Sequence, residues 1–339
     1  MIQKKLSASQ SLLDWFANNG RDLPWRVKNK AHDDPYAVWI SEIMLQQTTV
    51  KTVLDYFSRW MKRFPNIHVL AKADIQDVLI MWQGLGYYTR AKKIHECARL
   101  VVSKYNGLFP KTREELLKLP GIGPYTASSI CCFAYNMPET VVDGNVIRVI
   151  ARRYGLTHAV TQDEIYTLAQ KLTPQKEGAD YASAIMDLGA TVCTPSAPEC
   201  TRCPWKNDCL AFQKNLTDKI PLIQKPKKQA KSGIVHLIMN HQGNYYIRKR
   251  SEKGLLSGLY EFPWCYGTIP LFEALWTKQT KTVSHTFTHF KLTLTLYVTV
   301  LDHLPLNDGL FVALNDFEKY PFSTLMKKVI KNLKEISLS

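Results

Sequence analysis

The period of the hydrophobic pattern changes once along this chain, and that change constrains its architecture. Before residue 210, apolar side chains recur every three or four positions and almost nothing alternates. Over 292–300, by contrast, leucine and valine alternate with threonine and tyrosine, which is typical of a half-buried strand. A chain of 339 residues also exceeds one compact core. We therefore predict an all-α domain over 1–216 and an α+β domain over 233–339.

The segment 217–232 separates the two patterns. It holds two prolines and five lysines against one acidic residue, which predicts an exposed basic linker. After it we expect a hairpin with its turn at 241–244, and a closing helix capped by Ser323. Before it we expect helices at 49–64, 74–82, 91–105, 145–154, 163–172 and 181–190.

The string LPGIGPYTA, residues 119–127, predicts a tight turn between two helices. A capping box at Thr112 starts a short helix that we expect to run to residue 119, where a Pro-Gly pair ends it. The turn from Gly121 to Gly123 would present backbone N–H groups at the start of the second helix, where a phosphate binds well. An ordinary helical hairpin explains the same residues, so this motif alone does not decide.

The charge balance favours an anionic partner. The chain carries 44 Lys and Arg against 29 Asp and Glu, a formal net charge of +15. The first 232 residues carry 32 of these bases against 21 acids, so most of the excess lies there. Nucleic acid is the leading partner, and an acidic membrane surface is the alternative. No run approaches a membrane span, and the N-terminus lacks an apolar signal region. We expect an intracellular, bacterial-type cytoplasmic protein.

Four of the eight cysteines fall within seventeen residues. Intracellular cysteines are better interpreted as metal ligands or core thiols than as disulfides. Cys193, Cys200, Cys203 and Cys209 follow the spacing C-x6-C-x2-C-x5-C, and four such thiolates would share a metal or a cluster. Zinc is the alternative, although zinc sites usually show two C-x2-C pairs.

Two carboxylates are candidates for acid–base chemistry. Glu42 shares a helix face with the apolar Val38, Trp39 and Leu45, and burial there would raise its pKa toward that of a usable general acid. The alternative is a glutamate at a helix edge in a structural salt bridge.

Asp143 lies in VVDGNVIRV, between an apolar pair and a helix, where a simple cap or turn aspartate is also expected. Two carboxylates near one DNA-binding turn suit cleavage of a glycosidic bond, because one can protonate the leaving group while the other faces an oxocarbenium-like sugar. The base would have to be extruded from the duplex, since the bond is unreachable inside the stack.

Seven strings occur here in the order seen in adenine DNA glycosylases of the MutY type, within the helix-hairpin-helix, endonuclease III superfamily. The resemblance covers nearly the whole chain and implies a monofunctional DNA N-glycosylase of base excision repair. It would act as a monomer on duplex DNA with adenine:8-oxoguanine or adenine:guanine mispairs. It also implies a helix-hairpin-helix at 112–135 and a [4Fe–4S] cluster, structural or DNA-sensing, on the cysteine loop 193–209. The strings are RDLPWR, SEIMLQQT, QGLGYYTRAK, LPGIGPYTA, VVDGNVIRV, MDLGATVC and the cysteine loop.

The resemblance also implies roles for residues around the carboxylates. Glu42 would protonate adenine, and Asp143 would stabilise the sugar cation or attack it. Tyr125 and Asn145 match positions that line that site. Endonuclease III enzymes resemble this sequence but carry a nucleophilic lysine where Tyr125 stands, so a lyase step by that route is not expected.

Further residues are implied to contact DNA. Gln47 and Tyr87 match residues wedged into the duplex beside the extruded adenine, and Arg26, Gly121 and Gly123 match the DNA-contacting set. Without the family, Gln47 and Tyr87 could as easily be a polar helix-end residue and a packing residue.

The string GLLSGLYEFP, 254–263, resembles the opening of a Nudix fold. The acid-rich helix that binds metal in active Nudix hydrolases does not follow it, so a binding-only domain is expected. The resemblance implies that the domain reads 8-oxoguanine through His285, Phe287, Thr288 and His289. Family members often have serine at the position of Thr288. Taken alone, these residues could be a strand end with solvent-facing histidines.

Three rival functions are weaker. A pyrimidine-lesion glycosylase of the endonuclease III kind is disfavoured by Tyr125 and by the added domain. A non-catalytic mismatch-binding protein is disfavoured by the presence of both Glu42 and Asp143. A nucleotide hydrolase is disfavoured by the missing metal-binding helix.

Overall fold

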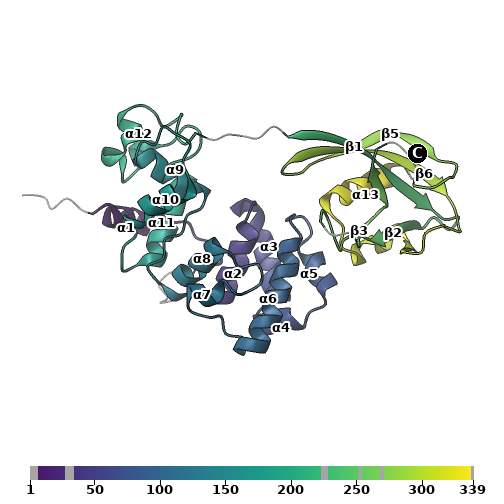
Figure 1. The fold of residues 1–339 in the computed structure, drawn as a ribbon, viewed down its shortest axis with the longest axis horizontal. Coiled ribbons are helices and arrows are strands. Elements are labelled where there is room, and N and C mark those ends of the chain that lie inside the picture. The colour runs from purple at the N-terminus through teal and green to yellow at the C-terminus, as the bar shows by residue number, and fades with distance from the viewer. Residues whose placement is uncertain (1–6, 27–33, 223–227, 252–253, 268–270, 337–339) are drawn as a thin grey trace, which may run out of the picture. The chain divides into compact units, whose positions relative to one another are not determined.

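The chain folds into two compact units (Figure 1). We describe residues 7–26, 34–222, 228–251, 254–267 and 271–336 of a computed structural model. The first unit spans Met1–Ala71 and Glu96–Gln224, and the second spans Lys72–His95 and Lys225–Ser339. The second unit therefore combines a short helical segment with the C-terminal part of the chain.

Helices dominate the described residues up to 213, as predicted. Most begin at a Ser, Thr or Asp whose side chain accepts a backbone N–H of the first turn. All six helices expected by range are present, with ends shifted by three residues at most. The helices are α1 (Ala8–Asn19), α2 (Pro35–Leu45), α3 (Val50–Arg63), α4 (Ile67–Lys72), α5 (Ile75–Met81), α6 (Thr89–Tyr105), α7 (Arg113–Leu116), α8 (Pro124–Tyr135), α9 (Gly144–Arg153), α10 (Gln162–Gln170), α11 (Gly178–Thr191) and α12 (Leu210–Gln213).

The first helix of the predicted hairpin is shorter than expected. It ends at Leu116, not at residue 119, and a tighter turn follows in which the Leu119 N–H donates to the Leu116 carbonyl at 3.0 Å. Pro120 disfavours the helical conformation for Leu119 alone, and the residues between Leu116 and Leu119 form this tighter turn.

Helix α2 is the central element of the first unit. Eight of its eleven residues are buried, and it packs against α3 and α8. A helix that is apolar almost all round belongs in a core. Helix α11 packs in turn on α1, α8 and α9. Among the described residues, no helix combines the length and apolar character needed to cross a membrane.

The C-terminal part forms a mixed sheet covered by a helix, which confirms the α+β prediction. Within the described residues the main strand order is β3-β2-β1-β6-β5, while β4 pairs with β1 and β7 with β2. Strands β1 and β6 run parallel along their whole length, and the expected hairpin joins β1 to β2. The elements are β1 (Gln229–Met239), β2 (Tyr245–Lys249), β3 (Tyr260–Glu261), β4 (Trp264–Tyr266), β5 (Thr277–Thr286), β6 (Phe290–Val300), β7 (Gly309–Val312) and α13 (Thr324–Ile336).

The predicted linker is partly structured. Strand β1 begins at Gln229, inside the segment 217–232, because its exposed first residues pair with β6 from Phe290 onward. Residues 223–227 of that segment lie outside the described residues.

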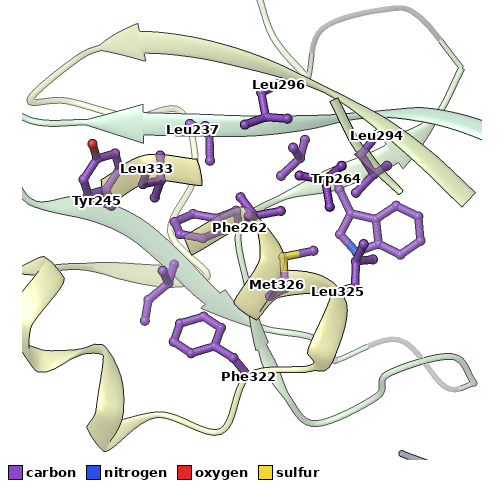
Figure 2. Close-up of a cluster of buried hydrophobic side chains, with 14 of the residues drawn as sticks. Leu237, Tyr245, Phe262, Trp264, Leu294, Leu296, Phe322, Leu325, Met326 and Leu333 are labelled. Atoms are coloured by element: carbon purple, nitrogen blue, oxygen red, sulfur yellow. The ribbon is translucent and has the colours of Figure 1, made fainter. Parts of the chain in front are cut away.

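Helix α13 closes the core of the sheet (Figure 2). Ser323 caps it as expected, accepting the Met326 N–H at 3.2 Å. Leu325 and Met326 point into a cluster with Phe262 and Trp264, and each such buried side chain stabilises the fold by about 2 kcal/mol.

The segment 72–95 is bound to the rest of the second unit by side chains that donate to backbone carbonyls. Gln83 donates to Tyr320 at 3.1 Å, and the Tyr88 hydroxyl donates to Phe322 at 3.3 Å. Lys92 donates from Nζ to the carbonyl of Ser257 at 2.8 Å.

Candidate active site, cysteine loop and lesion loop

A cavity of about 700 Å³ opens in the first unit, and residues of α2, α8, α9 and α11 line it. Six of the residues singled out in the sequence are among its walls. They are Arg26, Glu42, Gln47, Tyr125, Asp143 and Asn145.

Glu42 is a buried acid that faces this cavity. Its side chain comes from the centre of α2, and the residue is only 6% exposed. One carboxylate oxygen, Oε2, is buried and has no hydrogen-bond partner among the described residues. Burial raises the pKa of Glu42 to about 7; the hydrogen bond from the Tyr125 hydroxyl opposes this rise, and the nearby charge of Asp143 adds to it. A glutamate at a helix edge, the alternative from the sequence, does not describe this position.

Asp143 is both a helix cap and part of the cavity wall. Its Oδ1 accepts the Val146 N–H at 2.8 Å, which starts α9. Its Oδ2 accepts from the Asn145 side-chain amide at 2.9 Å. Asp143 is therefore a cap and a cavity residue at once, because the same carboxylate that starts the helix also faces the cavity.

Arg148 orients the Asn145 amide. Its Nη2 donates to the Asn145 Oδ1 at 2.9 Å and to the Gly189 carbonyl at 2.6 Å, and its Nε donates to the Cys193 carbonyl at 2.7 Å. With its oxygen held by a guanidinium, the amide must turn its NH₂ toward Asp143. This chain of hydrogen bonds connects the carboxylate to the start of the cysteine loop.

Arg26 lines the cavity, and a buried carboxylate holds its side chain in place. Asp187 on α11 is fully buried and accepts from Arg26 at 2.9 and 3.0 Å and from the Arg21 side chain at 2.7 and 2.9 Å. Burial would raise the pKa of Asp187, but the two guanidinium groups outweigh it and hold that pKa below its usual range. The loop that contains Arg21 and Arg26 is thereby fixed against α11.

The predicted glycine turn lies at the start of α8. Gly121 adopts a φ of +77°, which glycine permits, and Gly123 is the N-cap. No heavy atom of the described residues lies within 4 Å of where a Cβ of Gly123 would stand. A phosphate backbone could therefore approach this turn closely. Pro124 then begins the helix that carries Tyr125 into the cavity.

The four clustered cysteines follow α11. Backbone N–H groups of Trp205 and of Ala211 and Phe212 point at the sulfurs of Cys203 and Cys209, respectively. The buried Arg152 lies with Nη1 3.4 Å from the Cys193 sulfur and also donates to the carbonyls of Thr194 and Pro195. Among the described residues, no three His, Cys, Asp or Glu side chains are arranged to hold a single metal ion.

Comparisons with known proteins assign the chain to a family. Residues 40–175 match the model of the HhH-GPD superfamily of base excision DNA repair proteins, and residues 234–332 match that of the NUDIX domain. An adenine DNA glycosylase of Buchnera aphidicola subsp. Baizongia pistaciae is 32% identical over 97% of this chain and 97% of its own length. That of Mus musculus is 33% identical over 95% of this chain and 76% of its own. The chain belongs to the adenine DNA glycosylase family.

Solved structures agree with this assignment. A thermostable thymine-DNA glycosylase superposes with a TM-score of 0.55 at 28% identity, covering 61% of this chain and 95% of its own. A non-covalent endonuclease III–DNA complex gives 0.53 at 23% identity over 61% and 94%, which shows the shared fold. The predicted family, the two-part fold class and the DNA N-glycosylase activity of base excision repair are thus confirmed.

In this glycosylase the loop 287–289 connects β5 to β6. The Phe287 N–H donates to the Phe290 carbonyl at 2.8 Å, which closes a tight turn with Thr288 and His289 exposed at its tip. Phe287 stacks on Phe290 at 4.7 Å and meets the His285 ring edge-on at 4.6 Å. The strand-end interpretation is correct for the backbone, but His285 is half-buried, and its Nδ1 has no partner among the described residues.

The two residues predicted to enter the duplex share an uncommon backbone conformation. Gln47 and Tyr87 have φ values of +59° and +47°, although neither is glycine. Both side chains are exposed, Gln47 at the cavity and Tyr87 in the second unit, where its hydroxyl hydrogen-bonds to Thr288. Strain of this kind concentrates at functional positions.

Sequence reasoning missed three residues that organise this site. Arg21 lies in RDLPWR and Arg148 in VVDGNVIRV, but nothing in the sequence pattern indicates which groups these side chains bind. Asp187 did carry a signal, since a lone carboxylate inside ASAIMDLGA is as conspicuous as Glu42 inside its own apolar helix.

Proposed function

We propose that this glycosylase hydrolyses the N-glycosidic bond of adenine paired with 8-oxoguanine, and more weakly with guanine, in duplex DNA. The observation that carries the proposal is the pair formed by Glu42 and Asp143 on one cavity. Glu42 is a buried acid with an unpartnered oxygen, and Asp143 is a hydrogen-bonded carboxylate. Such a pair can protonate a leaving base and oppose a sugar cation.

The reaction divides between these two groups. The Glu42 carboxylic acid donates its proton to a ring nitrogen of the extruded adenine, and the bond from C1′ to the base breaks with its electron pair leaving on the base. The Asp143 carboxylate faces the resulting oxocarbenium-like sugar and stabilises it, or attacks it to give an intermediate that water hydrolyses. Attack of water gives the abasic sugar, and the proton released returns to Glu42.

No lyase step is proposed. Burial, followed by the charges of Glu42 and Asp143, raises the pKa of Tyr125 well above its usual value, so the phenol stays neutral. It has no amine with which to form a Schiff base. Its part is to hydrogen-bond the Glu42 carboxyl.

We further propose a [4Fe–4S] cluster on Cys193, Cys200, Cys203 and Cys209. The donor set fits: burial raises the thiol pKa values of Cys203 and Cys209, but backbone N–H groups at these two sulfurs and the Arg152 guanidinium at Cys193 oppose that effect and would support thiolates bound to iron. In a [4Fe–4S] cluster each of four thiolates binds its own iron, and the four clustered cysteines can supply these ligands. When bound, the cluster ties the loop together and supplies no step of the hydrolysis, which transfers no electrons.

Lesion reading is assigned to the domain 233–339 and catalysis to 1–216. The described residues between Glu261 and Thr277 form strand β4 and, among themselves, no helix. The exposed Thr288 and His289, with His285 and Phe287 behind them, would contact 8-oxoguanine as the glycosylase binds DNA as a monomer. Arg26, Gln47, Gly121 and Gly123 would contact the strand with the extruded adenine.

The test is single-turnover release of adenine from duplexes with adenine opposite 8-oxoguanine, guanine or thymine. We expect release from the first, slower release from the second and none from the third. Glu42→Gln should abolish release while DNA binding persists, and Glu96→Gln, at an exposed site on α6, is the matched control. Thr288→Ala should reduce the preference for 8-oxoguanine, and Thr288→Ser should retain it. A lack of release by wild-type protein with its iron content verified would refute the proposal.

A further inference from the structure

One arginine side chain lies at the centre of the turn that carries Tyr87. The turn joins α5 to α6, and φ is positive at Gly84, Gly86 and Tyr87. Glycine adopts this conformation readily, but a tyrosine in it is strained and must be held by its surroundings. Core packing cannot hold it, because Tyr87 is 46% exposed.

Arg90 bonds the turn from within. Its Nη2 donates to the carbonyl of Leu85 at 2.9 Å and to that of Gly86 at 3.2 Å. The Gly86 carbonyl also accepts from the Trp82 indole N–H at 3.0 Å. The backbone N–H of Arg90 donates to the Tyr87 carbonyl at 2.8 Å, so the start of α6 is fixed to the same turn.

The same guanidinium lies against two aromatic rings. Its Cζ is 5.2 Å from the ring centre of Trp82 and 5.6 Å from that of Tyr87. Trp82 is fully buried and provides a fixed base, whereas Tyr87 is the exposed ring. Each contact is within the range of a cation–π interaction. Burial lowers the pKa of Arg90 only to about 10, so its charge is present at neutral pH.

We propose that Arg90 is a positioning residue that holds Tyr87 ready for insertion into the duplex before DNA arrives. The inference rests on the proposed function and on the role that the family resemblance implies for Tyr87, wedged into the duplex beside the extruded adenine. A wedge that is already ordered does not have to lose its conformational freedom when the base leaves the stack. Arg90 itself needs no contact with adenine or with the reacting atoms.

The geometry requires arginine. Two neighbouring carbonyls and two ring faces surround one planar group, and a guanidinium can donate in its plane while its faces meet the rings. A lysine keeps the charge but lacks the planar group. Arg90→Lys should therefore retain part of the function, and Arg90→Met, which keeps similar length without charge or donors, should lose more.

The first experiment is a double-mutant cycle on adenine release from the adenine:8-oxoguanine duplex. Arg90→Met should slow release by about ten- to a hundredfold, the loss expected when charge-assisted hydrogen bonds are removed. If Arg90 acts through Tyr87, adding Arg90→Met to Tyr87→Ala should slow release no further. Arg99→Met, at an exposed position of α6, removes the same charge and should leave the rate within about twofold. Independent, multiplying effects of the two changes would overturn the inference.

The second experiment separates extrusion from chemistry. In protein carrying Glu42→Gln, 2-aminopurine in place of the target adenine reports unstacking by its fluorescence, and no bond breaks. Arg90→Met should slow that signal, while DNA affinity should match that of Arg99→Met. If wild-type protein released no adenine, the proposed function would fail, yet this signal would still test Arg90.

A structural defect would give a different result. For adenine in an unpaired bulge, which needs less wedging, Arg90→Met should release the base at nearly the wild-type rate. An equal loss on bulged and paired substrates would show damage to the fold or the catalytic cavity and would overturn the inference. If Arg90→Met fails to fold, Arg90→Lys provides the same comparison.

Discussion

At the residue scale, the proposed role of Glu42 as the general acid predicts how the reaction depends on pH. The acid must be protonated to act, and burial places its pKa at about 7. In the part of the rate–pH profile that Glu42 controls, the alkaline limb, single-turnover adenine release should therefore be fastest below pH 7. Well above pH 7 the rate should fall about tenfold for each pH unit. Tyr125→Phe removes the hydrogen bond that lowers the pKa of Glu42 and should move the limb to higher pH. A limb that does not move in this variant would contradict the assignment.

The same pKa predicts a stability cost. Since the carboxyl ionises near pH 4.5 when unfolded but near 7 when folded, the folded state binds more protons in between, and raising the pH destabilises it. Between pH 5 and pH 8 this group should lower the free energy of unfolding by about 2.5 kcal/mol. Glu42→Gln should remove that dependence, and urea unfolding of both proteins at the two pH values measures it. A constant difference between them would argue against a buried acid.

Some of these residues could be predicted from the sequence and others could not. Glu42 could, because an apolar helix face with one carboxylate indicates a perturbed group. Asp187 has the same signature but was passed over. Arg148 and Arg90 could not, because they bind backbone carbonyls, the Asn145 amide oxygen and aromatic rings that the folded chain brings within reach.

At the scale of elements, the contact between α9 and α11 determines where Asp143 stands. A Cβ on Gly189 of α11 would lie 2.6 Å from the Asn145 Cβ, so only glycine permits this approach. Gly189→Ala should push the start of α9 outward and slow adenine release by about a hundredfold, since small displacements of reacting groups cost that much.

Gly178→Ala is the matched control for that change. Gly178 lies at the other end of α11, and its Cβ would meet the Met137 carbonyl oxygen at 2.6 Å. Both variants should lose about 1–3 kcal/mol of stability. Only Gly189→Ala should lose activity beyond the fraction of protein that unfolds, and similar rates in the two variants would refute the geometric argument.

The positions of helices could be predicted where the apolar periodicity extended over several turns. Helices α3, α9 and α10, for example, each begin at a Thr or Asp whose side chain caps the first turn, and their buried apolar residues recur at helical spacing. Helix α4 was missed because it is about one and a half turns long and shows too little periodicity. The start of β1 was missed because its first residues are exposed and lysine-containing, and their strand conformation comes from pairing with β6.

At the scale of the molecule, the cysteine loop joins segments that are far apart in sequence. Arg152 on α9 donates to the Ile220 carbonyl at 2.9 Å, and Trp205 within the loop donates to the Ala8 carbonyl at 2.8 Å. The loop therefore holds α1, α9 and the end of the first unit together. The core of the sheet in the second unit is built from its own strands, from α13 and from Phe317 and Phe322 just before that helix.

Loss of one ligand of the proposed cluster should accordingly weaken the first unit. In Cys200→Ser we expect hydrogen exchange to rise in α1, in α9 and over 193–222, and the melting transition of the first unit to fall by more than about 5 °C. Exchange in β1 and β6 should stay unchanged. Cys265→Ser, in the second unit, is the control and should leave α1 and α9 protected. An equal rise of exchange in the sheet after Cys200→Ser would contradict this prediction.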